Sequence, residues 1–338
     1  MKPLSYSLIA AALACGLASA QTTAYTTPVG YITCNVAGTP AGFTSADTYL
    51  SPSLIESSEY AGVTVSALGK ELTFASGVPA TFGTAYVLEI TSGASEGWWS
   101  TVMSSTATTI TLNDAFPAGL SAGVAVSVRK HSTLLSFLGN NTPGFVTSNG
   151  ADPSDEVQIF NPATQGAVPY AYVSGADLGD PAYPNGAWLN LATSLIDNGA
   201  IIEPGSAIRV KRVAAGALTF TTVGTVKTTK TQVDLYKDYN WLGTLIANGR
   251  SLNGMLLNKQ LRQYDGASPD YDELQFLGAN QGTTPYAAYD DGLGGSMLNL
   301  ATSADGGADI FKEGTGAVVL RIGGGASTIT IPGTVVAP

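Results

Sequence analysis

The sequence has few of the residues on which most catalytic and metal sites depend. It contains one histidine, His131, and two cysteines, Cys15 and Cys34. A Ser-His-Asp triad would have to use His131, but Arg129 and Lys130 make a cationic neighbourhood that suits a linker better than a general base. The sequence has no Gly-Lys-Ser/Thr phosphate loop, HExxH motif or Cys-x-x-Cys pair. These absences favour a binding or structural protein over an enzyme.

Basic residues are also scarce. Charged residues make up 12% of the chain, and the acids outnumber the bases by 25 to 15. A protein that binds nucleic acid needs a concentrated basic face to displace counterions from the phosphates. The densest basic group, Arg209, Lys211 and Arg212, fits the solvated side of a strand. We therefore expect no nucleic-acid partner.

The first twenty residues, 1–20, have the layout of a secretory signal peptide. Basic Lys2 precedes an apolar run over residues 8–17 and a small-residue site that ends at Ala20. The run is shorter than the roughly 20 residues that span a bilayer, so we expect cleavage near Ala20 and no transmembrane segment in the mature chain. The minor alternative is a lipoprotein cleaved before Cys15. Cleavage at Ala20 leaves Cys34 as the last thiol, which excludes an intrachain disulfide.

Short alternating runs predict β-strands throughout the chain. Val124, Val126 and Val128 would share one face of a strand, because side chains alternate in a pleated backbone. Apolar alternation on both sides of Gly69 predicts a hairpin whose turn uses the left-handed conformation of glycine. Helical spacing is confined to short turns near residues 132–138 and 241–248. The predicted fold class is all-β.

Internal repetition is the strongest signal in the sequence. The segment Trp188 to Ser194 recurs at Met297 to Ser303 and differs only in its first residue. Leu50 matches Leu242 in a fainter repeat further upstream. Two shorter segments also recur, in the same order. Asp155-Glu156-Val157 matches Asp272-Glu273-Leu274, and Pro169-Tyr170 matches Pro285-Tyr286. The conserved order argues for a duplication rather than chance likeness.

This duplication predicts two related β-sandwich or barrel-like domains. The first would comprise residues 21–59 and 131–228, and the second residues 229–338. Residues 60–130 have no counterpart in the second copy and are rich in alternating strands, so we expect them to form a small inserted β-barrel or sandwich.

Three segments carry a resemblance to a known family. They are Thr-Thr-Pro-Val-Gly-Tyr at 26–31, residues 86–99 with their Thr-Ser-Gly-Ala turn, and the strand that starts at Asp155. In these segments the chain resembles a family of uncharacterised secreted β-rich proteins from environmental Gram-negative bacteria, and the likeness covers most of the mature chain. The resemblance implies export and β-architecture, and it implies no activity, cofactor or substrate.

The repeated carboxylates are candidates for polysaccharide hydrolase or lyase chemistry. A glycosidase needs two carboxyls about 5 to 10 Å apart across a cleft. Asp155 and Glu156 are adjacent on a strand, so their side chains would point to opposite faces. An acidic turn that leads into a buried strand is the better interpretation, and catalysis by Asp155 or Glu156 stays as an alternative.

Calcium is the other possible use of the acids. Calcium takes six to eight oxygen ligands from flexible loops, and several acidic clusters stand in glycine-containing segments. Solvated turn residues are the competing interpretation, because no cluster has EF-hand spacing. The candidate ligands are Asp152, Asp155 and Glu156, then Asp177 and Asp180, then Asp290 and Asp291, and finally Asp305 and Asp309.

Trp98 and Trp99 are the candidate ligand-binding residues. Strand alternation would send the two rings to opposite faces, so one would pack inward and the other could stack on a sugar or fill an interface. The alternative is that both rings are covered. We predict an exported, non-catalytic surface or matrix protein that acts in adhesion or assembly, with itself or surface polysaccharide as partner. A carbohydrate-binding protein is the first alternative and a polysaccharide hydrolase or lyase the second.

Overall fold

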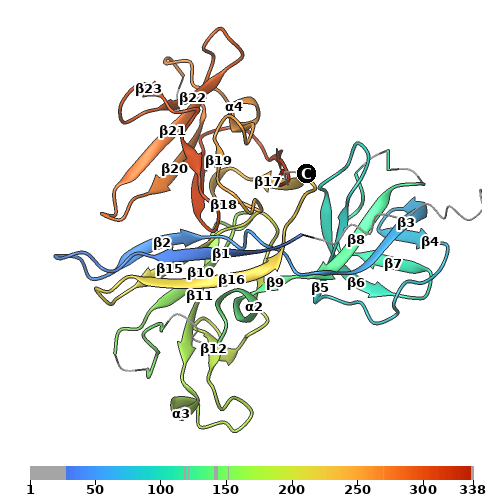
Figure 1. Ribbon diagram of the computed structural model, residues 1–338, viewed down its shortest axis with the longest axis horizontal. Coiled ribbons are helices and arrows are strands. Elements are labelled where there is room, and N and C mark those ends of the chain that lie inside the picture. Colours follow the sequence, from blue (N-terminus) through green and yellow to red (C-terminus); the bar gives the residue numbers. More distant parts are fainter. Residues whose placement is uncertain are drawn as a thin grey trace, which may run out of the picture.

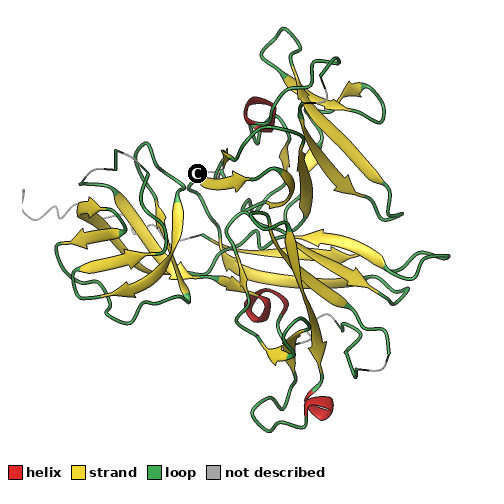
Figure 2. Ribbon diagram, turned by 180° about the vertical axis from the view of Figure 1, so that it is seen from behind, coloured by secondary structure: helices red, strands yellow, loops and turns green. Residues whose placement is uncertain are grey.

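The structure is a computed structural model that describes residues 28–117, 119–120, 122–140, 144–150, 152–268 and 270–335. Its regular structure is almost entirely β, which confirms the predicted fold class (Figure 1, Figure 2). The helices are short, namely α2 (Leu134–Leu138), α3 (Gly175–Leu178) and α4 (Leu257–Gln260). Within these described ranges, no helix is long and apolar enough to cross a membrane. The predicted signal peptide lies outside the described residues.

The first sheet has six antiparallel strands in the order β13-β12-β11-β10-β15-β2. Two antiparallel ribbons, β1-β16 and β9-β14, accompany it, and α2 follows β9. The strands are β1 (Val29–Val36), β2 (Ala46–Leu50), β9 (Ser132–Thr133), β10 (Glu156–Asn161), β11 (Gly166–Val173), β12 (Ala187–Asn190), β13 (Leu195–Ile196), β14 (Ile201–Ile202), β15 (Ile208–Arg212) and β16 (Leu218–Thr225).

The second sheet has the matching order β23-β22-β21-β20-β25-β18, with the ribbons β17-β26 and β19-β24. Its strands are β17 (Thr231–Leu235), β18 (Asp238–Gly243), β19 (Arg250–Ser251), β20 (Asp272–Leu277), β21 (Thr283–Tyr289), β22 (Ser296–Asn299), β23 (Ala304–Asp305), β24 (Ile310–Phe311), β25 (Gly316–Arg321) and β26 (Ser327–Ile331). The shared strand order is the arrangement that a duplication predicts. The duplication itself remains our interpretation of the sequence matches.

A closed six-stranded barrel follows β2 in the chain and has the order β3-β4-β7-β6-β5-β8. It stands beside the two sheets and is coloured cyan to green in Figure 1. Val126 and Val128 are buried in its core on the same face, as predicted, and Gly69 makes the β3-β4 turn with φ of 61°. The barrel strands are β3 (Ser58–Leu68), β4 (Glu71–Phe74), β5 (Tyr86–Ile90), β6 (Trp99–Ser105), β7 (Thr109–Leu112) and β8 (Ala125–Lys130).

The repeated segments have matching roles in the two sheets. Trp188 and Met297 are both buried in the cores, where they fill volume. The side-chain carbonyls of Asn190 and Asn299 each accept hydrogen bonds from backbone N–H groups two and three residues ahead. Each amide therefore stabilises the turn that follows its strand.

One local prediction from the sequence is wrong. The segment 241–248 does not begin as a helical turn, because Trp241 lies within β18 and Leu242 pairs with Ala317 of β25. Cross-strand pairing overrides the weak helical spacing there. The helical turn expected near 132–138 is present as α2, whose N-cap Thr133 accepts a hydrogen bond from the backbone N–H of Ser136.

The two sheets contact each other reciprocally, through matching residues. The Gln165 side chain, in the β10-β11 turn, accepts from the backbone N–H of Tyr239 and donates to its carbonyl, both at 2.9 Å. The Gln281 side chain, in the β20-β21 turn, accepts from the N–H of Asp47 at 2.7 Å and donates to its carbonyl at 3.3 Å. Asp47 and Tyr239 each lie three residues before the matched leucines of β2 and β18.

The centre of this interface repeats the pattern. The rings of Tyr49 and Trp241, which occupy matching positions in β2 and β18, meet edge to face with centroids 5.3 Å apart. Two isolated bridges, Leu50 with Thr315 and Leu242 with Ser206, join the strands. Such mutual use of the same surface is the pattern of an isologous twofold interface, formed here within one chain.

We predict that Gln165→Ala and Gln281→Ala each lower the free energy of unfolding by about 1–2 kcal/mol. Gln281→Ala removes two hydrogen bonds across the interface, and Gln165→Ala removes those to Tyr239 and a third to the carbonyl of Lys237 at 3.1 Å. Urea denaturation checks this. Ser303→Ala is the matched control, since Ser303 has a similar left-handed backbone with φ of 57° but lies outside the interface. An equal loss in the control would show that the glutamine contacts do not stabilise the docking.

Candidate functional site

A groove lies where the barrel meets the first sheet and the segment that leads into the second sheet. We call it the Trp groove. Its larger part has a volume of about 620 Å³, and its smaller part, over β10 and β11, about 270 Å³. The two parts are continuous, because Thr101, Glu203 and Ser206 line both. The remaining polar and aromatic lining residues of the larger part are Trp98, Trp99, Asn113, Asp114, Gln232, Asp234, Tyr236 and Thr328.

Both predicted tryptophans line this groove. Trp98 directly precedes β6, which begins at Trp99, and its side chain packs against the barrel core. Trp98 packs against Phe116 with centroids 5.7 Å apart. The indole N–H of Trp99 donates to the carbonyl of Gln232 at 3.0 Å. Both residues are half-buried.

The barrel wall of the groove is held by main-chain contacts. The backbone N–H of Gln232 donates to the carbonyl of Gly97 at 2.9 Å, and the Gln232 side-chain amide donates to the carbonyl of Glu96 at 3.2 Å. The Glu96 carboxylate in turn accepts from the backbone N–H of Lys230 at 3.1 Å. These bonds fix Trp98 and Trp99 opposite the start of β17.

A buried ionic cluster anchors the same junction. The Glu89 carboxylate lies between two cations, with Arg129 at 3.1 Å on one oxygen and Lys227 on the other. Lys227 also donates to the hydroxyl of Thr229 at 2.6 Å. Burial lowers the pKa of Lys227, and Glu89 opposes that shift. Breaking a buried pair of this kind is strongly unfavourable, so the cluster locks the barrel to the chain that follows β16.

The groove is acidic. Asp114, Glu203 and Asp234 line it, and no Lys, Arg or His does among the described lining residues. The Asp114 carboxylate accepts from the hydroxyl of Ser100 at 2.8 Å, and the Asp234 carboxylate from that of Thr328 at 2.6 Å. Glu203 is exposed to solvent, and partial desolvation together with the charges of Asp114 and Asp234 raises its pKa.

His131 connects β8 of the barrel to β9, and its side chain is buried there. Its Nε2 lies 3.1 Å from the hydroxyl of Thr101. Burial and, to a lesser extent, the charge of Arg129 lower the pKa of His131 to about 4. The imidazole is therefore neutral near pH 7, and no solvent reaches it as a general base requires.

This pKa predicts a specific pH dependence. The folded pKa of about 4 lies below the ordinary value of 6.5, so between these values the unfolded chain binds a proton that the folded chain does not. His131 therefore destabilises the fold as the pH drops from 6.5 to 4, by about 3 kcal/mol in total. We expect the unfolding free energy of His131→Gln to decline less than that of the wild type across this window. Parallel curves for the two proteins in urea titrations would contradict the assignment.

Asp155 and Glu156 have separate partners within the fold. Asp155 is buried, pairs with Arg212 at 2.6 Å, and accepts from the backbone N–H groups of Val146 and Val213. Glu156 is half-buried and accepts from the side chain of its neighbour on the same face, Gln158. The pairing also corrects our view of Arg212, which is buried rather than solvated.

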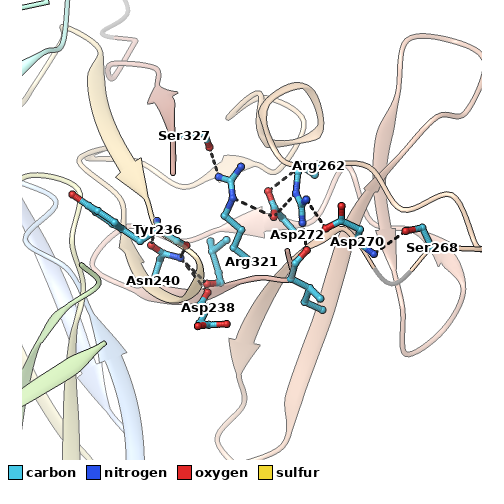
Figure 3. Close-up of polar contacts among 11 residues, drawn as sticks. Tyr236, Asp238, Asn240, Arg262, Ser268, Asp270, Asp272, Arg321 and Ser327 are labelled. Atoms are coloured by element: carbon cyan, nitrogen blue, oxygen red, sulfur yellow. Dashed lines mark hydrogen bonds and ion pairs between the residues drawn. The ribbon is translucent and has the colours of Figure 1, made fainter. Parts of the chain in front are cut away.

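The matching Asp272 has the same structural role. Figure 3 shows it between Arg262 and Arg321, whose Nε atoms lie 3.2 and 3.9 Å from one carboxylate oxygen. Asp272 also accepts from the backbone N–H of Arg262 at 3.0 Å. Arg262 extends the network to Asp270 at 2.5 Å. The repeated carboxylate is thus a buried ion-pair partner in each sheet.

The other candidate calcium ligands are engaged within separate loops. Most accept hydrogen bonds from backbone N–H groups two to four residues away, as acidic turn residues do. Over the part of the chain that the structure describes, no three His, Cys, Asp or Glu side chains form a group that could hold a metal. Calcium binding stays an untested prediction for Asp152, Asp177, Asp180, Asp290, Asp291, Asp305 and Asp309.

Most of the groove could not be predicted from the sequence. Asp114, Glu203 and Asp234 come from three distant segments and belong to no spaced motif. Of the lining residues, the adjacent Trp98 and Trp99 form a pattern that is visible in the sequence. No family model, curated protein or solved structure matches the chain.

Proposed function

We propose that the chain is an exported, non-catalytic protein that adheres to polysaccharide through the Trp groove. The observation that supports this most is that Trp98, Trp99 and Tyr236 line one groove together with residues that carry amide and hydroxyl groups. Aromatic rings cover the apolar faces of sugars, while the polar groups meet their hydroxyls. The volume lies within the range of ligand sites.

The charge of the groove narrows the ligand class. Three carboxylates line it without a cation, so an acidic polysaccharide would be repelled on entry. Neutral sugars and amino sugars suit this field, since a protonated amine would be attracted to Asp114, Glu203 and Asp234. The partner in this proposal is a neutral or amino-sugar polysaccharide of a surface.

Export supports the same function. The layout of residues 1–20 is that of a secretory leader, which would place the mature chain where surface polysaccharides occur. Low charge and a rigid, ion-paired junction between barrel and sheets suit a protein that holds a ligand without moving. Adhesion, rather than self-assembly, is therefore the form of surface role that we favour.

We predict that Trp98→Ala lowers affinity for chitohexaose or cellohexaose at least tenfold, because truncating an aromatic anchor in a groove commonly costs more than 1 kcal/mol. Calorimetry with the two hexasaccharides measures this. Tyr31→Ala is the control, since Tyr31 is 76% exposed on β1 and does not line the groove. Absence of binding to both sugars and to a wider glycan array by the wild type would overturn the proposal.

A second candidate function, polysaccharide hydrolysis, rests on the carboxylates of the groove and uses different residues from those first considered. Glu203 has a raised pKa, which suits a general acid, and Asp114 or Asp234 would supply the ionised partner. This candidate would replace the non-catalytic role while keeping the same groove and the same class of sugar.

If hydrolysis occurs, Glu203→Gln is expected to lower turnover of the bound polysaccharide at least a hundredfold and to leave binding within a few-fold, because the amide keeps the shape but cannot donate the acid proton. Released reducing ends provide the assay. Asp152→Asn, in an exposed loop away from the groove, is the matched control. A wild type that binds polysaccharide without any turnover would eliminate this candidate and retain adhesion.

A further inference from the structure

The second sheet carries a groove of about 550 Å³ on the surface that matches the smaller part of the Trp groove. We call it the Lys groove, after Lys312. Its lining in the second sheet includes Phe276, Thr284, Tyr286, Ile310, Lys312 and Thr315. The matching residues of the first sheet all line the Trp groove, and in the same order they are Ile159, Val168, Tyr170, Ile201, Glu203 and Ser206.

The match follows from strand positions. Ile159 pairs with Val168 across β10 and β11, and Phe276 pairs with Thr284 across β20 and β21. Glu203 directly follows β14 and Lys312 directly follows β24. Each lies two residues before a glycine with left-handed φ, of 80° in one sheet and 70° in the other. The two grooves are therefore the same surface of the two sheets.

The opposite wall of the Lys groove comes from the first sheet and its accompanying ribbon. Asn35 and Val36 of β1 and Thr48 and Tyr49 of β2 lie there. The Trp groove has a corresponding wall from Asp234 of β17, and the barrel adds a further wall that the Lys groove lacks. Both grooves thus depend on the reciprocal docking of the sheets, while the barrel makes them chemically different.

Charge is the main difference between them. Lys312 is exposed in the Lys groove and has no ion-pair partner within the described residues. Of the two carboxylates that line the same groove, Asp47 pairs with Arg209 at 3.5 Å, and Asp309 keeps its charge while it accepts from the hydroxyl of Tyr286 at 2.8 Å. The Lys groove therefore has one unpaired cation beside two carboxylates, whereas the described lining of the Trp groove has three carboxylates and no cation.

Aromatic surface is present in both grooves. Phe276 is half-buried and meets Tyr286 edge to face with centroids 5.8 Å apart, and Tyr49 faces them from the other wall. Burial, with the charge and hydrogen bond of Asp309, raises the pKa of Tyr286 to about 12, so its hydroxyl stays a donor at neutral pH. These rings give the Lys groove the same means of contacting sugar faces.

We propose that the Lys groove is a second saccharide site, which selects a sugar that carries a carboxylate, such as a uronate, through Lys312. The inference rests on the proposed function, because it extends sugar recognition from one groove to its counterpart. One chain would then bind two different saccharides at once. It would link an acidic polysaccharide to a neutral or amino-sugar polysaccharide, and it would bind a surface that carries both with higher avidity.

Calorimetry on the full mature chain tests the proposal with hexagalacturonate, cellohexaose and chitohexaose. We expect one hexagalacturonate to bind per chain. It should remain bound when the Trp groove is saturated with cellohexaose or chitohexaose. We expect Lys312→Glu to lower the affinity for hexagalacturonate at least tenfold, and Lys312→Gln to lower it by less. Neither substitution should change the affinity of the Trp groove for its sugar. Lys259→Glu makes the same charge change on exposed α4 and is the control.

Each other outcome overturns the inference. Equal affinity of hexagalacturonate for Lys312→Glu and Lys259→Glu would exclude the Lys groove, as would equal affinity of the wild type for hexaglutamate, which carries carboxylates without sugar rings. Binding of cellohexaose or chitohexaose without hexagalacturonate would leave the proposed function intact and reject the second site. Failure of all three sugars to bind would reject both.

Discussion

The reciprocal docking of two similar sheets is the constraint on which the rest of the structure depends. Gln165 and Gln281 each reach across and satisfy both backbone groups of one residue on the other sheet. These bonds replace water at the strand edge, and the Tyr49–Trp241 contact excludes solvent from the centre. Because each sheet supplies a wall for the groove of the other, the interface positions both candidate sites at once.

The barrel adds an asymmetry to this arrangement. It docks through the carboxylate of Glu89, which is buried between Arg129 and Lys227, and through the hydrogen bonds of Gln232. Buried charges demand partners, so this junction tolerates few alternative geometries. The barrel consequently brings Trp98 and Trp99 to one groove and adds no residue to the matching groove, so the two related surfaces have different linings.

Periodicity and repetition in the sequence were enough to predict the fold class. Alternating runs indicated an all-β fold, and the segment repeated from Trp188 and from Met297 begins with a buried core residue in each sheet. The site was less predictable, because only adjacent residues leave a visible pattern. Trp98 and Trp99 were found as a pair, whereas Glu203 joins them through a sheet interface that no local spacing describes. Asp155 was misleading as a candidate ligand, since a buried structural carboxylate and a catalytic one look alike until Arg212 is placed beside it.

The most direct test of sugar binding in the Trp groove is an NMR titration of the tryptophan indole N–H signals with chitohexaose. The chain has four tryptophans, and Trp98 and Trp99 line the groove while Trp188 is buried in the core of the first sheet. If the sugar binds in the Trp groove, the signals of Trp98 and Trp99 shift and saturate together, and the signal of Trp188 does not move. Unchanged signals from Trp98 and Trp99 in the presence of a bound saccharide would contradict binding in the Trp groove and place the binding site elsewhere.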